Sequence, residues 1–146
     1  MEQAVNDPAV FRWPVRVYFE DTDAAGIVYY ANYLKYFERC RTEWLRALGI
    51  DQRELAARER LQFVVVDLAV QYQRPARLDD ALTIDAAIAE QARSYLVFRQ
   101  QARRGTELLA SARVKVACVE SGRLTPVRLP QQLVERLAAP PVCADN

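Results

Sequence analysis

Hydrophobic residues follow two different periods along the chain, and the change of period marks where a helix gives way to strands. Between residues 32 and 48 they recur at every third or fourth position, which is the spacing of one face of an α-helix. Asn32 is a candidate N-cap, and Gly49 suits the left-handed position that ends many helices. We therefore predict a long helix whose apolar face consists of Tyr33, Phe37, Cys40, Trp44 and Leu48.

Other segments alternate between apolar and polar residues, which is typical of half-buried β-strands. The longest of them is bounded by turn signals at 104–105 and 120–123. The first contains Pro14, which lacks a backbone donor and favours the edge of a sheet. The predicted strands are Phe11–Phe19, Val66–Tyr72, Leu82–Glu90, Tyr95–Arg103 and Leu108–Cys118.

Short helices at 51–60 and 129–139 complete the pattern, with a loose leader over residues 1–10 and a C-terminal helix and tail over 129–146. The order of strand, long helix and then four strands is that of an α+β domain, in which one five-stranded, mostly antiparallel sheet packs on one helix. We expect a single domain over residues 1–146. Because its sheet edges need a partner, we also expect a homo-oligomer, either a dimer or a tetramer.

Composition narrows the classes of partner. The 146 residues carry a formal net charge of +1, which gives no support to nucleic acid or an acidic membrane surface as a partner. No apolar run approaches membrane length, and the first ten residues lack the pattern of a signal peptide. The cysteines Cys40, Cys118 and Cys143 are odd in number and lack framework spacing, which favours reduced thiols. We expect a cytoplasmic protein without stable membrane insertion.

The chain contains no histidine. This excludes Ser–His–Asp and Cys–His catalysis, and nearly every catalytic zinc site. Any chemistry must therefore use carboxylates, hydroxyls, Arg side chains or backbone groups. We expect neither a metal nor a cofactor.

Three carboxylates, Glu20, Asp21 and Asp23, precede Gly26 and the predicted helix. One interpretation is that they are solvated turn residues that bond local backbone groups. Another is acyl transfer, because a carboxylate ahead of a helix can act as base or nucleophile while the unpaired N–H groups of the helix stabilise an oxyanion. For Glu20 and Asp21 the first interpretation suffices.

Two further interpretations of this acidic loop fail. An EF-hand calcium loop also opens with Asp-x-Asp, but its fifth position here is Ala25 and its twelfth is Asn32 instead of Glu. An aspartyl phosphatase needs an alternating βαβ domain with a downstream Lys. The later chain reads as consecutive strands and offers only Lys115.

The acidic loop lies within a longer block of recognisable sequence. The matching pieces are FRWPVRVY (Phe11–Tyr18), EDTDAAGIVYYANYL (Glu20–Leu34) and ERCRTEWLR (Glu38–Arg46), with FVV, PARLDD and SYLVF further along. In these pieces the chain resembles the hotdog-fold thioesterases of the Tol–Pal-associated (YbgC-like) acyl-CoA thioesterase group, relatives of 4-hydroxybenzoyl-CoA thioesterase. The resemblance implies a five-stranded sheet wrapped around one long central helix, and hydrolysis of an acyl-CoA to a carboxylic acid and CoA.

The resemblance also implies roles for particular residues. Asp23 would be the catalytic carboxylate, and the backbone N–H of Tyr30, where the helix begins, would polarise the thioester carbonyl. Some relatives carry His at this position, so proton transfer by that His is absent here. Candidate substrate-binding residues are Gly26 and Val28 in the loop, and Arg74, Arg77, Arg93 and Ser94 near predicted strand ends. The Arg side chains could reach CoA phosphates, although a solvated sheet rim is the alternative for each.

A different class of function also fits this fold. The alternative to an acyl-CoA hydrolase is a non-catalytic module that binds acyl-CoA or acyl carrier protein and is linked to the cell envelope. A hotdog dehydratase would need a His paired with a carboxylate, which this chain cannot supply. Acyl-CoA is the expected substrate, and acyl carrier protein is the other candidate carrier of the thioester.

Overall fold

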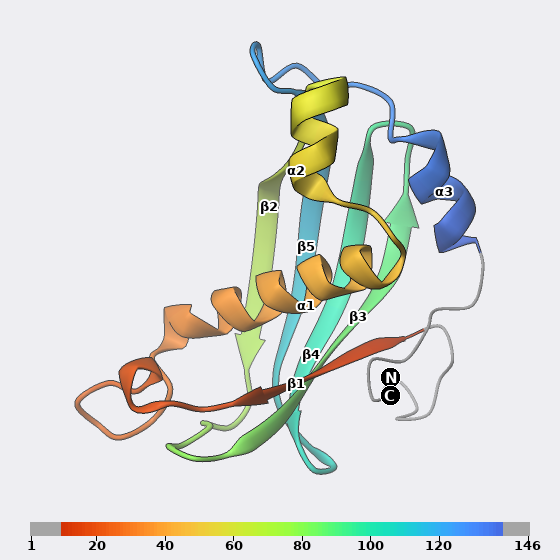
Figure 1. Cartoon of the computed structure of the whole chain (residues 1–146). Helices are drawn as coiled ribbons and strands as arrows, with labels where there is room; N and C mark the ends of the chain where they lie inside the picture. Colours follow the sequence, from red (N-terminus) through yellow and green to blue (C-terminus); the bar gives the residue numbers. More distant parts are fainter. Residues whose placement is uncertain (1–9, 139–146) are drawn as a thin grey trace.

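The structure is a computed structural model that describes residues 10–138. Most of the expected leader, the end of the expected tail and Cys143 lie outside the described residues. Figure 1 shows a five-stranded sheet that curves around one long helix. This is the hotdog arrangement that the resemblance implies, so the predicted α+β class is confirmed.

The strands are β1 (Phe11–Arg16), β2 (Leu61–Tyr72), β3 (Ala81–Gln91), β4 (Tyr95–Arg104) and β5 (Glu107–Glu120). Every neighbouring pair is antiparallel, and the order across the sheet is β1-β3-β4-β5-β2. The strand with Pro14 therefore lies at an edge, as predicted. The predicted start of β2 at Val66 is wrong, because the preceding residues already pair with the end of β5 ahead of a bulge. The first strand ends before Phe19, which begins a 3₁₀ turn, η1 (Phe19–Asp21).

The central helix, α1 (Tyr33–Ala47), is preceded by one 3₁₀ turn, η2 (Tyr30–Asn32). It ends at Gly49 as predicted, because the N–H groups of Gly49 and Ile50 donate to earlier carbonyls at 3.0 and 2.9 Å in the pattern of a Schellman motif. The shorter helical segments are α2 (Gln52–Glu54), which continues as a π turn, η3 (Leu55–Glu59), and α3 (Gln131–Leu137). Between residues 10 and 138, no helix combines the length and the apolar character needed to cross a bilayer.

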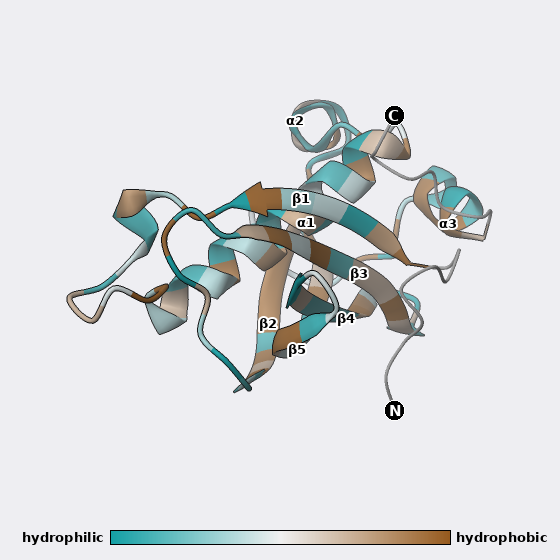
Figure 2. Cartoon of the chain, turned by 90° about the horizontal axis from the view of Figure 1, so that it is seen from below, coloured by the Kyte–Doolittle hydropathy of each residue, from teal (hydrophilic) through white to brown (hydrophobic). Residues whose placement is uncertain are grey.

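The aromatic face of α1 packs on the sheet and forms the core. Phe37 and Cys40 are buried there, and Trp44 stacks on Phe11 of β1 with ring centroids 5.9 Å apart. Figure 2 looks from below and shows the strands curving around α1, with hydrophobic stretches on β1, β3 and β5. The Cys40 thiol lies 3.6 Å from the carbonyl of Ile84, and burial raises the pKa of this thiol. Cys40 therefore serves packing, as expected, and not nucleophilic chemistry.

Asn32 occupies the position directly before α1, as the sequence predicts, but it does not act as a capping residue. Its backbone is already helical, with φ of −69° and ψ of −23°, and its side chain makes no capping bond. The additional turn η2 moves the cap position back to Tyr29. The Asn32 amide instead turns into the protein and donates to the buried Asp21 carboxylate at 3.0 Å. A charged acceptor distant in sequence has replaced the local capping bond.

Candidate active site

A short hairpin carries Asp23 on one strand and leads into the start of the helix on the other. Thr22 and Val28 form an antiparallel bridge, and the Asp23 N–H donates to the carbonyl of Ile27 at 2.8 Å. Gly26 closes the turn with φ of 81°. A Cβ at Gly26 would meet nothing within 4 Å, so the glycine is needed for its positive φ and not for lack of space. The chain thus returns so that Asp23 stands opposite the residues that lead into η2.

The Asp23 side chain is partly exposed. Its Oδ1 accepts the N–H of Ala25 at 2.9 Å, which is the local turn bond that the first interpretation of the acidic loop expects. Among residues 10–138, Oδ2 has no hydrogen-bond partner. One carboxylate oxygen is therefore held by the turn, while the other is open to a substrate or a water molecule.

Tyr30 is the first residue of η2, which continues into α1. The first N–H groups of a helical segment have no acceptor within it, and they carry the positive end of the helix dipole. The Tyr30 side chain is 64% exposed, and its ring contacts that of Tyr29 with centroids 4.9 Å apart. The backbone of Tyr30 therefore lies at the site, while its phenol faces outward.

The loop between β2 and β3 holds this region from the other side. Ala76 is fully buried; its carbonyl accepts the Val28 N–H at 2.9 Å, and its own N–H donates to the Tyr33 hydroxyl at 3.1 Å. Ile27 forms a bridge with Arg77 one residue further on. The hairpin and the first turn of α1 are thus both fixed to the same short segment.

A cluster of tyrosines forms the wall between the helix start and β2. The Tyr72 hydroxyl donates to the Tyr30 carbonyl at 2.6 Å, and the rings of Tyr72 and Tyr33 lie 5.4 Å apart. Burial raises the pKa of both Tyr33 and Tyr72, so these phenols stay neutral. A mostly apolar cavity of about 250 Å³ lies here, and Ile27, Val28 and Tyr30 contribute to its lining. It could hold an uncharged group next to the N–H groups of η2.

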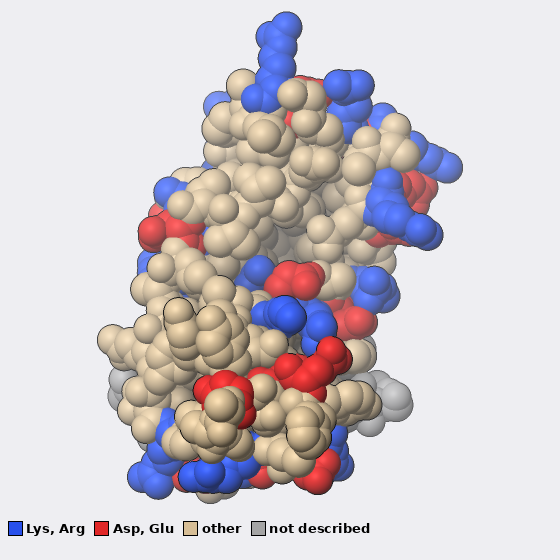
Figure 3. Space-filling view, turned by 90° about the vertical axis from the view of Figure 1, so that its left-hand side faces the viewer, with Lys and Arg blue, Asp and Glu red and all other residues tan. Residues whose placement is uncertain are grey.

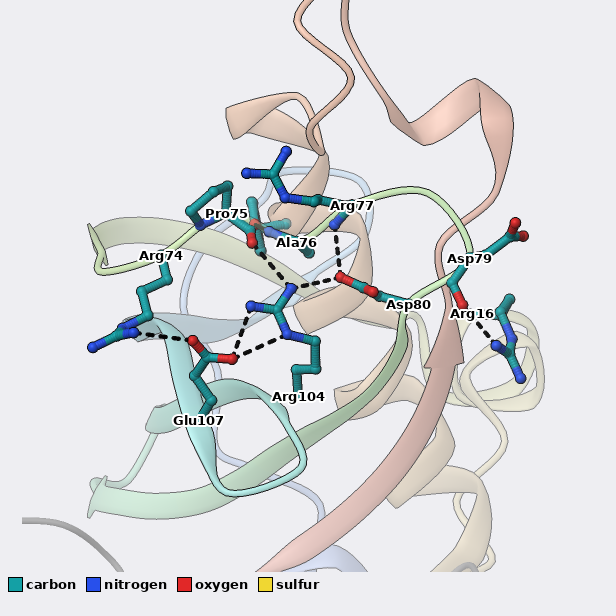
Figure 4. Close-up of polar contacts among 10 residues, drawn as sticks. Arg16, Arg74, Pro75, Ala76, Arg77, Asp79, Asp80, Arg104 and Glu107 are labelled. Atoms are coloured by element: carbon teal, nitrogen blue, oxygen red, sulfur yellow. Dashed lines mark hydrogen bonds and ion pairs between the residues drawn. The ribbon is translucent and has the colours of Figure 1, made fainter.

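Arg104 cross-links the loop between β2 and β3 to the β4–β5 turn, as Figure 4 shows. Its Nη1 donates to Asp80 Oδ2 at 2.6 Å and to the Pro75 carbonyl at 3.3 Å, while its Nη2 donates to Glu107 at 2.8 Å. Burial alone would raise the pKa of Asp80, but the N–H of Arg77 and the Arg104 guanidinium outweigh it and lower that pKa. The network therefore carries its charges at neutral pH.

The structure divides the other predicted substrate residues into two groups. Arg74 and Arg77 lie in the loop after β2, close to the hairpin. Arg74 forms an ion pair with Glu107 at 3.2 Å, whereas the Arg77 side chain points away from the network in Figure 4. Arg93 and Ser94 lie in the β3–β4 turn, separated from the Arg104 end by the length of β4, about 30 Å. One chain alone does not bring these two residues to the acidic loop.

The side of the molecule beside β2 is apolar and hollowed. Val65 and Val66 are 50% and 54% exposed on this edge strand, which pairs only with β5 among the described strands. A cavity of about 160 Å³ opens between β2 and α1. Figure 3 looks onto this side and shows an uncharged surface with a hollow, bordered by mixed charges. The apolar residues that line the cavity include Phe63, Leu96 and Phe98.

Several residues that build the site escape sequence reasoning. The sequence favours a solvated turn role for Asp21, yet this residue is only 9% exposed. From the sequence alone, Arg104 is recognised only as part of a turn, and Tyr72 is recognised only as a strand residue. The PARLDD piece is a usable signal, because it contains both Ala76 and Asp80. The chemistry now visible is that of a carboxylate, backbone N–H groups and phenols; residues 10–138 hold no cluster of Cys, Asp and Glu suited to a metal ion.

Comparison with known proteins identifies the family. The model of the thioesterase superfamily matches residues 25–111. An acyl-CoA thioesterase YbgC of Haemophilus influenzae is 46% identical over 123 residues, which cover 84% of this chain and 90% of that protein. An acyl-CoA thioester hydrolase YbgC of Escherichia coli O157:H7 is 47% identical over 126 residues, covering 86% and 93%. The crystal structure of a probable thioesterase from Bartonella henselae superposes with a TM-score of 0.80 at 37% identity, covering 84% of this chain and all of that one. The chain belongs to the thioesterase superfamily.

Proposed function

We propose that this chain hydrolyses acyl-CoA thioesters to a carboxylic acid and CoA, with Asp23 as the catalytic carboxylate and the Tyr30 N–H as an oxyanion donor. The observation that carries the proposal is the 22–28 hairpin. One of its strands carries a carboxylate with one open oxygen, and its other strand leads into a helix start with unpaired N–H groups. The relatives named acyl-CoA thioesterase or thioester hydrolase, at 46% and 47% identity, support the reaction class.

The reaction follows from these groups. A thioester carbonyl at the start of η2 would accept hydrogen bonds from the N–H groups there, and each such donor stabilises the developing oxyanion by on the order of 3 kcal/mol. Asp23 either attacks the carbonyl carbon, giving an anhydride that water cleaves, or takes a proton from an attacking water molecule. In both routes the C–S bond breaks and CoA leaves as a thiolate. Because a thiolate needs no strong general acid, the chemistry suits a chain without histidine.

The two routes differ in one measurable species. Nucleophilic attack by Asp23 would leave the acyl group on the protein for part of each turnover, whereas activation of water would not. The intact mass of enzyme quenched within the first turnover would carry the added acyl mass only in the first route.

Substrate binding uses the surfaces next to this centre. The cavity beside Tyr30 and Tyr72 has room for the thioester end of the substrate, and its mostly apolar lining suits an uncharged group. Arg74 and Arg77, at the mouth of the same region, are the candidates for the CoA phosphates. Acyl carrier protein would present the same thioester without these nucleotide phosphates, so a preference for acyl-CoA would depend on these two residues.

We include a homodimer through β2 in the proposal. An edge strand with exposed Val65 and Val66 offers unpaired backbone groups and apolar side chains to a second copy. A two-fold axis near Val66 would pair β2 antiparallel with itself, because an isologous contact uses the same patch twice. That pairing would bring the Phe63 end of one strand, with its 160 Å³ cavity, close to the Tyr72 end of the partner. The cavity would then offer an apolar wall for the acyl chain.

A hydrolysis screen tests the proposal. Purified protein is mixed with acyl-CoA substrates of increasing chain length and with acyl carrier protein thioesters, and the free thiol is detected. We expect thiol release from acyl-CoA that depends on Asp23. Tight binding of acyl-CoA without turnover would support the alternative of a non-catalytic binding module and would defeat the proposal.

A further inference from the structure

A buried carboxylate that takes no part in the proposed chemistry holds the residues on both sides of Tyr30. Both oxygens of Asp21 are engaged: Oδ2 accepts the N–H of Tyr18 at 2.8 Å, and Oδ1 accepts the side-chain amide of Asn32 at 3.0 Å. The main-chain carbonyl of Asp21 accepts the N–H of Tyr29 at 2.9 Å. One residue thus ties the chain after β1 to Tyr29 and Asn32, which lie one residue before and two residues after the proposed oxyanion donor.

Asn32 completes this link from the helix side. It is the last residue of η2, it is 6% exposed, and its own N–H donates to the carbonyl of Tyr29 at 2.8 Å. A single 3₁₀ turn has poor hydrogen-bond geometry, so its shape depends on contacts from outside the turn. The bond from Asp21 is such a contact, made inside the protein where water competes little. The direction of the Tyr30 N–H follows from where Tyr29 and Asn32 are held.

The surroundings of Asp21 and Asn32 strengthen the hydrogen bond between their side chains. The hydroxyl of Tyr36 is buried beside Asp21 and Asn32. Burial, and to a lesser degree hydrogen bonding to the Asp21 carboxylate and its charge, raise the pKa of Tyr36, so the phenol stays protonated and adds no second negative charge. The contact between the Asp21 carboxylate and the Asn32 amide is therefore a charge-assisted bond in a surrounding of low polarity.

We infer that Asp21 and Asn32 are positioning residues for hydrolysis: together they set the orientation of the Tyr30 N–H toward the thioester carbonyl. The inference rests on the proposed function. It replaces the interpretation of Asp21 as a solvated turn residue, and it assigns the Asn32 side chain to the site and not to a helix cap.

The roles of Asp21 and Asn32 can be tested by swapping the two residues. Asp21→Asn leaves one acceptor oxygen for two donors, the Tyr18 N–H and the Asn32 amide, and Asn32→Asp places two carboxylates face to face. We expect each single variant to lose about 10- to 100-fold in kcat, the scale of a misplaced catalytic group, with KM changed less than about threefold. The double variant restores one donor and one acceptor, and its kcat should return to within about threefold of the unaltered protein. Glu20→Gln, on the exposed neighbouring carboxylate, is the matched control and should keep full activity.

Folding is measured beside activity, by circular dichroism and thermal unfolding. A residue that served stability alone would lower the melting temperature and leave kcat unchanged in the folded variant. Full kcat in folded Asp21→Asn would therefore overturn the inference, and so would a folded double variant that stays inactive. If Asp21→Asn does not fold, Asn32→Ala deletes the donor amide of the same bond and keeps the Asp21 carboxylate, and full kcat in that variant would have the same consequence.

If the protein is not a thioesterase at all, the experiment gives a result that differs from failure of the positioning inference. In that event the unaltered protein releases no thiol from any acyl-CoA, and the geometry is followed by amide hydrogen exchange at residues 29–32. The inference then predicts faster exchange there in Asp21→Asn and no change in Asp23→Asn, because only the former removes the contact with Asn32. Equal rates of amide hydrogen exchange at residues 29–32 in both variants would overturn the inference.

Discussion

Removal of the Arg104 side chain should lower catalytic activity without touching the substrate. This side chain fixes the loop between β2 and β3, and that loop holds both the 22–28 hairpin and the start of α1. Arg104→Gln keeps much of the side-chain length but loses the charge and the fork of donors. The substitution removes the hydrogen bonds to Asp80 at 2.6 Å and to the Pro75 carbonyl at 3.3 Å, together with the bond to Glu107. The loop keeps its main-chain bonds to Val17 and Leu109 at its two ends, and between them it remains attached through Ala76 and the Ile27–Arg77 bridge.

The expected magnitude is small for stability and larger for activity. The side chains of Arg104 and Asp80 are 31% and 23% exposed, so their ion pair lies at the upper end of the range for surface pairs, about 1 kcal/mol. That corresponds to a fall of about 3 °C in melting temperature for a domain of this size. Ala76, in contrast, bonds both Val28 and Tyr33, and a displacement of about 1 Å at a catalytic centre can reduce rate by a hundredfold. We expect kcat/KM to fall by about tenfold.

The assay is thiol release under steady-state conditions at 25 °C, with thermal unfolding measured on the same preparations. Arg60→Gln is the matched control, because Arg60 pairs with Glu120 at 2.9 Å at the opposite end of β5. It should also lower the melting temperature slightly, but it should leave kcat/KM unchanged. Equal kcat/KM in Arg104→Gln and in the control would refute the reasoning, since the loop would then hold its position without the network.

Three other outcomes can be measured with the same protein. Tyr30→Phe should lose less than about twofold in turnover, whereas Tyr30→Pro, which deletes the N–H, should lose about a hundredfold or more; similar losses in both would make the phenol the catalytic group. Val66→Lys should convert the dimer to a monomer by light scattering, and an unchanged mass would exclude the β2 interface. Burial raises the pKa of Asp85 to about 6, so the folded state binds the proton more tightly than the unfolded chain and stability falls as pH rises from about 4 to 6. Asp85→Asn should therefore gain about 2 kcal/mol relative to the unaltered protein between pH 4.5 and 7.5 in denaturant unfolding, and a constant difference would contradict this.

The fold was predictable where one face of an element is buried and the other is solvated. The apolar positions of α1 and of β5 repeat with the helical and strand periods because each element has one buried face. The start of β2 was missed because Phe63 to Val66 is a continuous apolar run. Phe63 and Val65 line a cavity, while the apolar Val66 is exposed, so no alternation of apolar and polar residues marks the strand.

The site was predictable only in part, because local rules cannot see distant partners. The capping rule selected Asn32 correctly as a residue of the helix start, but its amide engages Asp21, eleven positions earlier in the sequence. Arg74 and Arg93 look alike near predicted strand ends, yet they lie at opposite ends of the sheet. The length of β3, which lies between them in the chain, separates them.

The most direct test of the central claim is the turnover of Asp23→Asn. The substitution is nearly isosteric, and its amide oxygen can still accept the Ala25 N–H that shapes the turn. Because the amide is neither nucleophilic nor basic, kcat for acyl-CoA hydrolysis should fall by at least about a hundredfold while the dissociation constant for acyl-CoA, measured by calorimetry, stays within about threefold. Near-normal kcat in the folded variant would remove Asp23 from the mechanism and contradict the account.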